Sequence, residues 1–272
     1  MRPAKFDYHR PTSVTEAVQL LTQTDGAKAL AGGHSLIPAM NLRLSQPDAL
    51  VDIGRIEELH GIRVEGSSLI IGALTTHAQI AASKDVQKHC SALAEACGNV
   101  GDAQVRNWGT LGGNIAHADP ASDPPTVLVA CNAIIHIQGT RGSRTVGAEE
   151  FFMDVFTTDL QPGELITAVE IPSLADWQTG YIKMPHPASR YAVVGVAVAL
   201  HMAGGKCDQA RVALGGVTAK ATRATHAEKA LIGSALDAAA LDSAAKAIMV
   251  DVGDHPMSDI YADGEYRRAM AG

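Results

Sequence analysis

The sequence predicts an α+β fold, with a small α/β unit at the start and an antiparallel sheet followed by helices at the end. Three observations lead to this prediction. Near the start, short apolar stretches run into polar loops and then into helical patterns. A change of composition at residues 173–180 divides the chain into two parts. Beyond that break, a valine-rich alternating segment at residues 191–202 precedes two alanine-rich helical segments.

The composition is that of a globular protein with an acidic surface. The chain has 272 residues, 46% of them hydrophobic, which is enough for a large packed core. Its formal net charge is −7 and its basic residues are scattered, which argues against a nucleic-acid or anionic-membrane surface. The first residues lack an apolar signal core and no apolar run approaches a membrane span, so we expect a cytoplasmic protein.

The four cysteines do not form a metal-binding pattern. Cys90, Cys97, Cys131 and Cys207 are widely spaced and include no C-x-x-C pair. Zinc and iron–sulfur sites use clustered thiolates, so we expect no metal site in this chain. We expect the cysteines to be small buried residues in a reducing compartment.

The first part of the chain predicts a compact α/β unit. Residues 13–22 predict a helix that Thr12 or Ser13 can cap, with its apolar positions on one face. Residues 28–31 predict a strand that ends in a pair of glycines, and residues 36–42 predict a helical turn after them. Residues 49–53 predict another strand. The unit therefore centres on a strand–loop–helix connection.

The middle of the chain mixes strands and helices. Two short strands around a polar turn predict a hairpin at residues 61–71. Helices are predicted at residues 78–82, 86–97 and 126–130, and strands at residues 133–138 and 165–171. A second glycine pair lies between the second and third of these helices, in a stretch that we predict to be a loop.

The last part of the chain predicts an antiparallel sheet and helices. Residues 191–202 and 210–217 predict partner strands around a glycine turn. Residues 225–232 and 237–250 predict two helices. Residues 259–268 are polar and charged, and their sequence leaves open whether they are a solvated tail or a surface that faces partner subunits.

Two glycine pairs are the candidate ligand-binding features. We call residues 30–35 the first glycine segment and residues 105–114 the second glycine segment. Glycines allow backbone N–H groups to approach a ligand, and several such groups can hold a phosphate without charged side chains. Two segments of this kind suggest a pyrophosphate-bridged dinucleotide. Tight turns without a ligand are the alternative at both places.

Several common motifs are missing from the chain. Neither glycine segment has the G-x-G-x-x-G spacing of a Rossmann dinucleotide-binding domain. There is no Walker A loop, no H-E-x-x-H and no G-x-S-x-G. We therefore expect any redox chemistry to come from a bound cofactor.

Three motifs together carry a resemblance to a known family. They are Ala31-Gly32-Gly33-His34-Ser35, Thr110-Leu111-Gly112-Gly113-Asn114 and Asp119-Pro120-Ala121-Ser122-Asp123. With these motifs in this order, the chain resembles the FAD-binding medium subunit of the molybdenum hydroxylases, the family of xanthine dehydrogenase and carbon monoxide dehydrogenase. The match covers essentially the whole chain.

The resemblance implies a vanillyl-alcohol-oxidase-type FAD-binding fold. This fold has two α/β subdomains, here at about residues 1–57 and 58–175, which together form the FAD-binding domain at residues 1–175. Residues 176–272 are then a C-terminal domain with an antiparallel three-stranded sheet and helices, of the type found in the flavoproteins of molybdenum hydroxylases.

The resemblance also implies the cofactor-binding residues. They are Leu30, Ala31, Gly32, Gly33, His34, Ser35, Thr110, Gly113 and Asn114 at the pyrophosphate, Asp123 at the ribose or adenine, Leu165 and Ile166 along the isoalloxazine ring, Lys183 near the polar edge of the ring, and Tyr191 over its face. A cation at the ring edge would stabilise a reduced anionic flavin. Contact of the flavin with His34, His77, His117 and Tyr191 is left open, and no side chain is assigned an acid–base role.

The implied function is that of an FAD-carrying electron-transfer subunit, and so of an oxidoreductase. In the family, a large subunit holds the molybdenum–pterin cofactor and a small subunit holds two [2Fe–2S] clusters. The medium subunit passes electrons to a small-molecule acceptor such as NAD, oxygen or a quinone. The chain would be part of a heterotrimer, and a dimer of heterotrimers is a further expectation. A stand-alone flavin oxidoreductase and a cofactor-free assembly subunit are the alternatives.

Overall fold

The N-terminal unit is a three-stranded parallel sheet with two helices. The computed structural model describes residues 2–272, so the first residue of the expected FAD-binding domain lies outside the described range. The strands β1 (Asp7–His9), β2 (Lys28–Leu30) and β3 (Ala49–Asp52) lie in the order β1-β3-β2. Helix α1 (Val14–Gln23) and the short helix α2 (Leu36–Asn41) connect them. Ser13 caps α1 by accepting a hydrogen bond from the Glu16 N–H, which confirms that prediction.

The second subdomain is built on an antiparallel sheet, in which no pair of neighbouring strands among the described residues is parallel. Its strands are β4 (Ile62–Glu65), β5 (Ser68–Gly72), β10 (Leu165–Ile171), β6 (Ile134–Gly139) and β7 (Gly142–Gly147), in that spatial order. The short helix η1 (Glu57–Leu59) leads into the sheet. Helix α9 (Ala148–Phe151) and the two small strands β8 (Phe152–Asp154) and β9 (Thr157–Thr158) follow β7.

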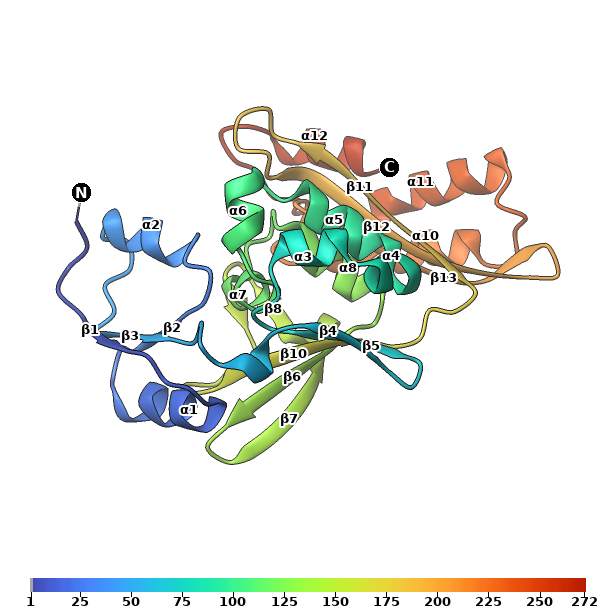
Figure 1. Ribbon diagram of the computed structural model, residues 1–272. Helices are drawn as coiled ribbons and strands as arrows, with labels where there is room; N and C mark the ends of the chain where they lie inside the picture. The colour runs from blue at the N-terminus through green and yellow to red at the C-terminus, as the bar shows by residue number, and fades with distance from the viewer. Residues whose placement is uncertain (1) are drawn as a thin grey trace.

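A layer of helices lies between this sheet and the C-terminal domain (Figure 1). It contains α3 (His77–Ala82), α4 (Lys84–His89), α5 (Ser91–Asn99), α6 (Ala103–Trp108), α7 (Leu111–His117) and α8 (Asp123–Ala130). The single helix expected at residues 86–97 is wrong, because Cys90 adopts φ −158° and ψ 78° and divides it into α4 and α5. The loop expected at the second glycine segment is also wrong, since that segment forms α6 and α7.

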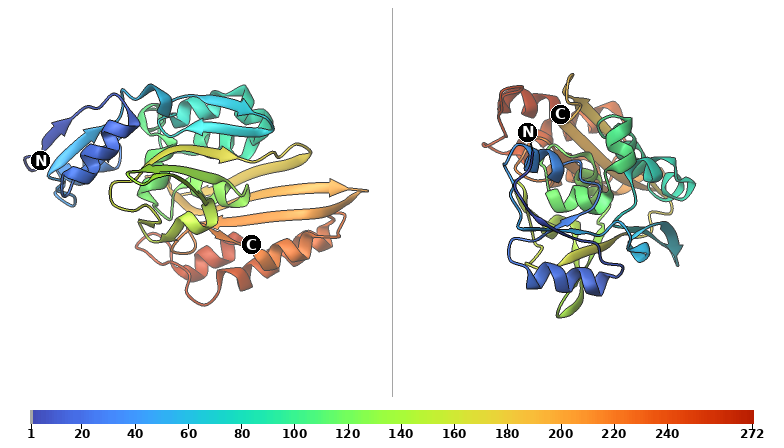
Figure 2. Two further views of the ribbon diagram at one scale, coloured as in Figure 1. Left: turned by 90° about the horizontal axis from the view of Figure 1, so that it is seen from below. Right: turned by 60° about the vertical axis from the view of Figure 1, so that its left-hand side comes forward.

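The C-terminal domain has an antiparallel sheet of four strands. They are β11 (Trp177–Pro185), β12 (Ala192–Ala203), β13 (Lys206–Gly215) and the two-residue strand β14 (Thr222–Arg223), in sequence order. The resemblance implies three strands, and the two-residue β14 is a fourth. The sequence patterns predicted only β12 and β13, so they missed both β11 and β14. Helices α10 (Thr225–Leu231), α11 (Ala238–Val252) and α12 (Gly264–Ala271) cover one face of this sheet (Figures 1 and 2).

One hydrophobic core continues from the helix layer into the C-terminal sheet. Helix α5 packs on β11, and α8 packs on β12 and β13. As a result, Tyr181, Ala197 and Ala213 belong to the same buried cluster as Leu93 and Val127. A second cluster fills the space between the sheet and α10 to α12. In residues 2–272, no helix is both long and apolar enough to cross a membrane.

The C-terminal residues do not form a solvated tail. They fold into α12, and Arg267 on that helix is only 3% exposed. Its guanidinium donates hydrogen bonds of 2.7 Å to the carbonyl oxygens of Val193 and of Gly216, and it pairs with Asp259. Arg267 therefore fastens α12 to the ends of β12 and β13. Tyr266, by contrast, is 44% exposed.

We expect the substitution Arg267→Met to destabilise the protein by about 2–3 kcal/mol, because two buried carbonyl groups lose their hydrogen-bond donors. Urea unfolding monitored by circular dichroism measures this loss. Arg141→Met, at an exposed position in the turn between β6 and β7, is the control and should change stability by less than about 0.5 kcal/mol. Equal unfolding midpoints for the two variants would contradict the assigned role of Arg267.

Candidate functional site

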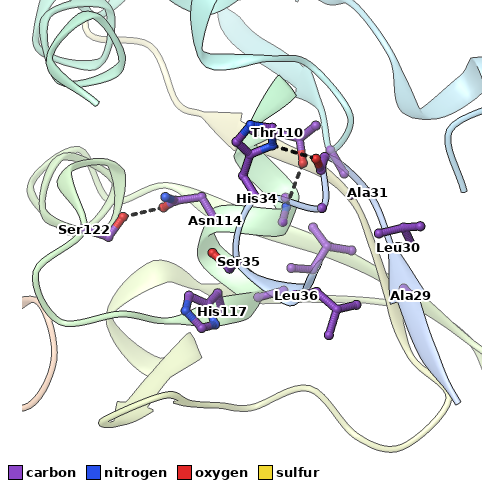
Figure 3. A pocket seen from close by; sticks show the side chains of 18 of the residues that line it. Ala29, Leu30, Ala31, His34, Ser35, Leu36, Thr110, Asn114, His117 and Ser122 are labelled. Atoms are coloured by element: carbon purple, nitrogen blue, oxygen red, sulfur yellow. Dashed lines mark hydrogen bonds between the residues drawn. The ribbon is translucent and has the colours of Figure 1, made fainter. Parts of the chain in front are cut away.

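A cavity of about 800 Å³ lies where the three parts of the protein meet. The N-terminal unit contributes the first glycine segment, the helix layer contributes His77 and the second glycine segment, and the C-terminal domain contributes the loop that ends at Tyr191. Figure 3 shows side chains of Leu30, Ser35, Thr110 and Asn114 around this space. The volume lies within the range of cofactor pockets. The fold thus brings together residues that are far apart in sequence.

The first glycine segment offers a row of free backbone donors. Among residues 2–272, the N–H groups of Gly32, Gly33, His34 and Ser35 have no hydrogen-bond partner. Gly33 has φ +73°, a conformation that favours glycine. A Cβ atom at Gly32 would lie 2.0 Å from the carbonyl oxygen of Trp108, so this residue must be glycine to pack against the end of α6. The row forms a concave site suited to an anion.

The second glycine segment has a different role. Its N–H groups are already used: Leu111 donates to the Thr75 carbonyl, Gly112 to the Ala73 carbonyl and Gly113 to the Thr110 hydroxyl oxygen. A Cβ atom at Gly112 would lie 2.6 Å from that of Ala73. The glycines therefore allow α7 to begin in close contact with the segment before α3. The expectation that they present free N–H groups to a phosphate is wrong.

At the second glycine segment, side chains rather than free backbone N–H groups offer hydrogen-bond donors to the cavity. Thr110 caps α7 through its oxygen, which leaves its hydroxyl hydrogen available. Asn114 accepts a hydrogen bond of 2.7 Å from the Ser122 hydroxyl, which fixes the orientation of its amide group (Figure 3). Its NH₂ group has no partner among residues 2–272 and is available to a ligand.

A buried ion pair lies at one side of the cavity. Asp123, which lines the cavity, accepts hydrogen bonds of 2.6 Å from the Tyr181 hydroxyl and 2.9 Å from Lys183 Nζ. The Lys183 side chain is 4% exposed and also donates to the Asn99 carbonyl. Burial raises the pKa of the Asp123 carboxyl, and its two hydrogen-bond partners partly offset that rise. Burial and the neighbouring Asp123 carboxylate raise the pKa of Tyr181.

Lys183 is the one residue assigned to FAD that does not line the cavity. The other thirteen residues are on its lining, from Leu30 to Ser35 and from Thr110 to Tyr191. Lys183 lies behind Asp123 and is not an ordinary solvated lysine, because its side chain is buried. Tyr181, which completes the ion pair, was missed because β11 was not predicted and a single tyrosine there gives no signal for such a role. Leu165 and Ile166, at the start of β10, supply apolar wall, and Tyr191 faces them from the C-terminal domain.

Three histidines line the cavity. His34 places Nδ1 3.0 Å from the Gly32 carbonyl oxygen, and the His117 ring packs against Phe156 with centroids 5.0 Å apart. His77 is 2% exposed, and burial lowers its pKa to about 4, so it is neutral at physiological pH. Within residues 2–272, no three His, Cys, Asp or Glu side chains group at metal-binding distances.

This lining fits FAD. A pyrophosphate needs several N–H and O–H donors, which the first glycine segment, Thr110 and Asn114 supply. A flavin ring needs apolar walls, which the leucine and isoleucine of β10 supply.

Comparisons with known families match both parts of the chain. Residues 4–174 match the FAD binding domain in molybdopterin dehydrogenase. Residues 179–272 match the CO dehydrogenase flavoprotein C-terminal domain.

Individual proteins are similar over the full length. The chain is 41% identical to the carbon monoxide dehydrogenase medium chain of Hydrogenophaga pseudoflava, a match that covers 100% of this chain and 95% of the relative. It is 40% identical to the glyceraldehyde dehydrogenase medium chain of Sulfolobus acidocaldarius, covering 99% and 95%. A solved structure of carbon monoxide dehydrogenase from Hydrogenophaga pseudoflava has a TM-score of 0.95 at 42% identity, covering 100% of this chain and 94% of that one.

Proposed function

The chain belongs to the family of FAD-binding medium subunits of molybdenum hydroxylases, and from this we propose that it is the electron-transfer subunit of such a complex. In this role it receives electrons from [2Fe–2S] clusters of a small partner subunit and passes them to an acceptor such as NAD, oxygen or a quinone. A large partner subunit holds the molybdenum–pterin cofactor. The observation that carries the proposal is the cavity with its row of free backbone donors at residues 32–35.

We assign different residues of the cavity to different parts of FAD. The backbone of residues 32–35, the Thr110 hydroxyl and the Asn114 amide hold the pyrophosphate. Asp123 accepts a hydrogen bond from a ribose hydroxyl, and Leu165, Ile166 and Tyr191 enclose the ring. Bound FAD supplies the redox chemistry. We assign Lys183 an indirect role, in which it acts on the cofactor through Asp123. Its ammonium group donates a hydrogen bond to the Asp123 carboxylate and does not line the cavity.

The substrate is chosen outside this chain. Relatives of nearly equal identity belong to a carbon monoxide dehydrogenase and to a glyceraldehyde dehydrogenase. Medium chains of complexes with such different substrates need no side chains that contact the organic substrate. We accordingly assign no catalytic residue in the cavity. The four cysteines are buried, and no three His, Cys, Asp or Glu side chains of residues 2–272 group at metal-binding distances, so we place the clusters on a partner. We further propose a cytoplasmic complex and a division into domains at residues 175 and 176.

We expect the native complex to contain this chain, a large chain and a small chain in equal amounts. Metal analysis should give one molybdenum and four irons for each FAD, as two [2Fe–2S] clusters require. The mass of the complex tests whether it is a dimer of heterotrimers. A yellow protein that is isolated without partner chains or metal would support a stand-alone oxidoreductase. A colourless protein that releases no FAD on denaturation would support the assembly subunit and contradict flavin binding.

A further inference from the structure

His77 is held rigidly beside the phosphate-binding part of the cavity. It is the first residue of α3, directly after the capping box formed by Thr76 and Gln79. Its backbone N–H donates to the Gly109 carbonyl, and a Cβ atom at Gly109 would lie 3.0 Å from the Cδ2 atom of its ring. Gly109 in turn lies against Gly32 of the first glycine segment. The imidazole ring of His77 and Gly32, the first residue with a free N–H group, therefore both lie against Gly109.

The two ring nitrogens of His77 are in different surroundings. Nδ1 is enclosed, and it has no hydrogen-bond partner among residues 2–272. Nε2 is not enclosed and also has no partner in that part of the chain, so it is the nitrogen that a ligand in the cavity can reach. An unpaired buried N–H is rarer in proteins than an unpaired acceptor. The favoured tautomer is therefore the one with the proton on Nε2.

The charge of the surroundings agrees with a neutral donor. Burial lowers the pKa of His77 to about 4, and no neighbouring carboxylate offsets the effect. Among residues 2–272, the cavity lining includes one lysine, Lys28, and one arginine, Arg190. Neither of these positively charged residues belongs to a glycine segment. The phosphate-binding part of the cavity thus depends on neutral donors, of which the His77 ring is one with no other partner.

We propose that His77 is a further cofactor-binding residue, which donates a hydrogen bond from Nε2–H to a phosphate oxygen of FAD beside Gly109. This inference rests on the proposed function, because it requires FAD in the cavity. It assigns a binding role to Nε2 and leaves Nδ1 as the enclosed nitrogen without a proton. A hydrogen bond to a charged group of this kind contributes binding energy as well as orientation.

The test compares His77→Leu with His77→Gln in the full-length chain. Gln keeps a side-chain N–H donor and Leu removes it. FAD affinity is measured by the quenching of flavin fluorescence at pH 7.5. We expect Leu to weaken FAD binding roughly tenfold or more and Gln to stay within about threefold of the parent protein. Equal affinities of the parent and the Leu variant, with both folded by circular dichroism, would overturn the proposal.

A second measurement does not depend on the variants folding. Long-range ¹H–¹⁵N spectra of the unsubstituted protein with labelled histidine report which ring nitrogen of His77 carries the proton. We expect Nε2–H, with an ¹⁵N shift change on addition of FAD. A proton on Nδ1, or no change while FAD binds, would contradict the proposal for His77 alone. Failure of the unsubstituted protein to bind FAD at all would instead contradict the proposed function.

Discussion

Replacing Gly32 with alanine is expected to weaken FAD binding roughly a hundredfold, which corresponds to about 2.7 kcal/mol. The added methyl group would lie 2.0 Å from the Trp108 carbonyl oxygen, and this neighbour is backbone that cannot rotate away. The first glycine segment must then move away from α6. The positions of its four free N–H groups on the cavity lining change together, so we expect the pyrophosphate to lose several hydrogen bonds at once.

Fluorescence titration with FAD measures this effect, and thermal unfolding of the apoprotein shows whether the variant remains folded. Gly98→Ala is the matched control. Gly98 lies in α5, and a Cβ atom there would meet only Ala81, at an ordinary 3.8 Å. We expect the control to bind FAD like the parent protein and to gain a little stability, since alanine favours a helix. Unchanged FAD affinity in Gly32→Ala would show that the segment does not hold the pyrophosphate.

Replacing Lys183 with methionine is expected to destabilise the protein by about 3–5 kcal/mol at pH 8, the usual cost of leaving one member of a buried ion pair without its partner. The Asp123 carboxylate is 5% exposed and would keep only the Tyr181 hydroxyl as a donor. Lys246→Met is the control, because Lys246 is 76% exposed and pairs with Asp242 at the surface. The control should lose less than about 1 kcal/mol.

The loss of folding stability in Lys183→Met should depend on pH. Burial raises the pKa of Asp123, and Lys183 is the first of the groups that oppose this rise, so the pKa rises further in the variant. The folded variant then binds more protons than the unfolded chain between the two pKa values, and its stability decreases as pH increases. Urea unfolding at pH 5 and pH 8 should therefore show a smaller deficit at pH 5. An equal deficit at both values would mean that Asp123 ionisation is not the cause.

Most of the secondary structure could be predicted from local patterns. The cap at Ser13, the hairpin β4–β5 and the long strands β12 and β13 were found because capping residues, turns and alternating apolar residues act over only a few positions. The resemblance to the molybdenum hydroxylase family also predicted the residues of the cofactor site. Thirteen of the fourteen assigned residues lie on the cavity lining.

The errors occurred where tertiary contacts override local preference. Gly112 and Gly113 are poor helix formers, yet they begin α7 because only glycine allows that helix to approach Ala73. Cys90 interrupts a pattern that predicts one continuous helix. Arg267 is a charged residue in a polar stretch, and its burial depends on carbonyl groups 51 and 74 positions away.

The sequence by itself determined most of the helices and strands, the order of the motifs and the family, because these depend on residues close together along the chain. Only the tertiary structure decided that the first glycine segment has free N–H groups and the second does not. It also decided that Lys183 pairs with Asp123 and that His77 is buried on the cavity lining with Nδ1 unpaired. Hydrogen-bond partners and burial are set by segments that meet only in the folded chain, so no local pattern records them.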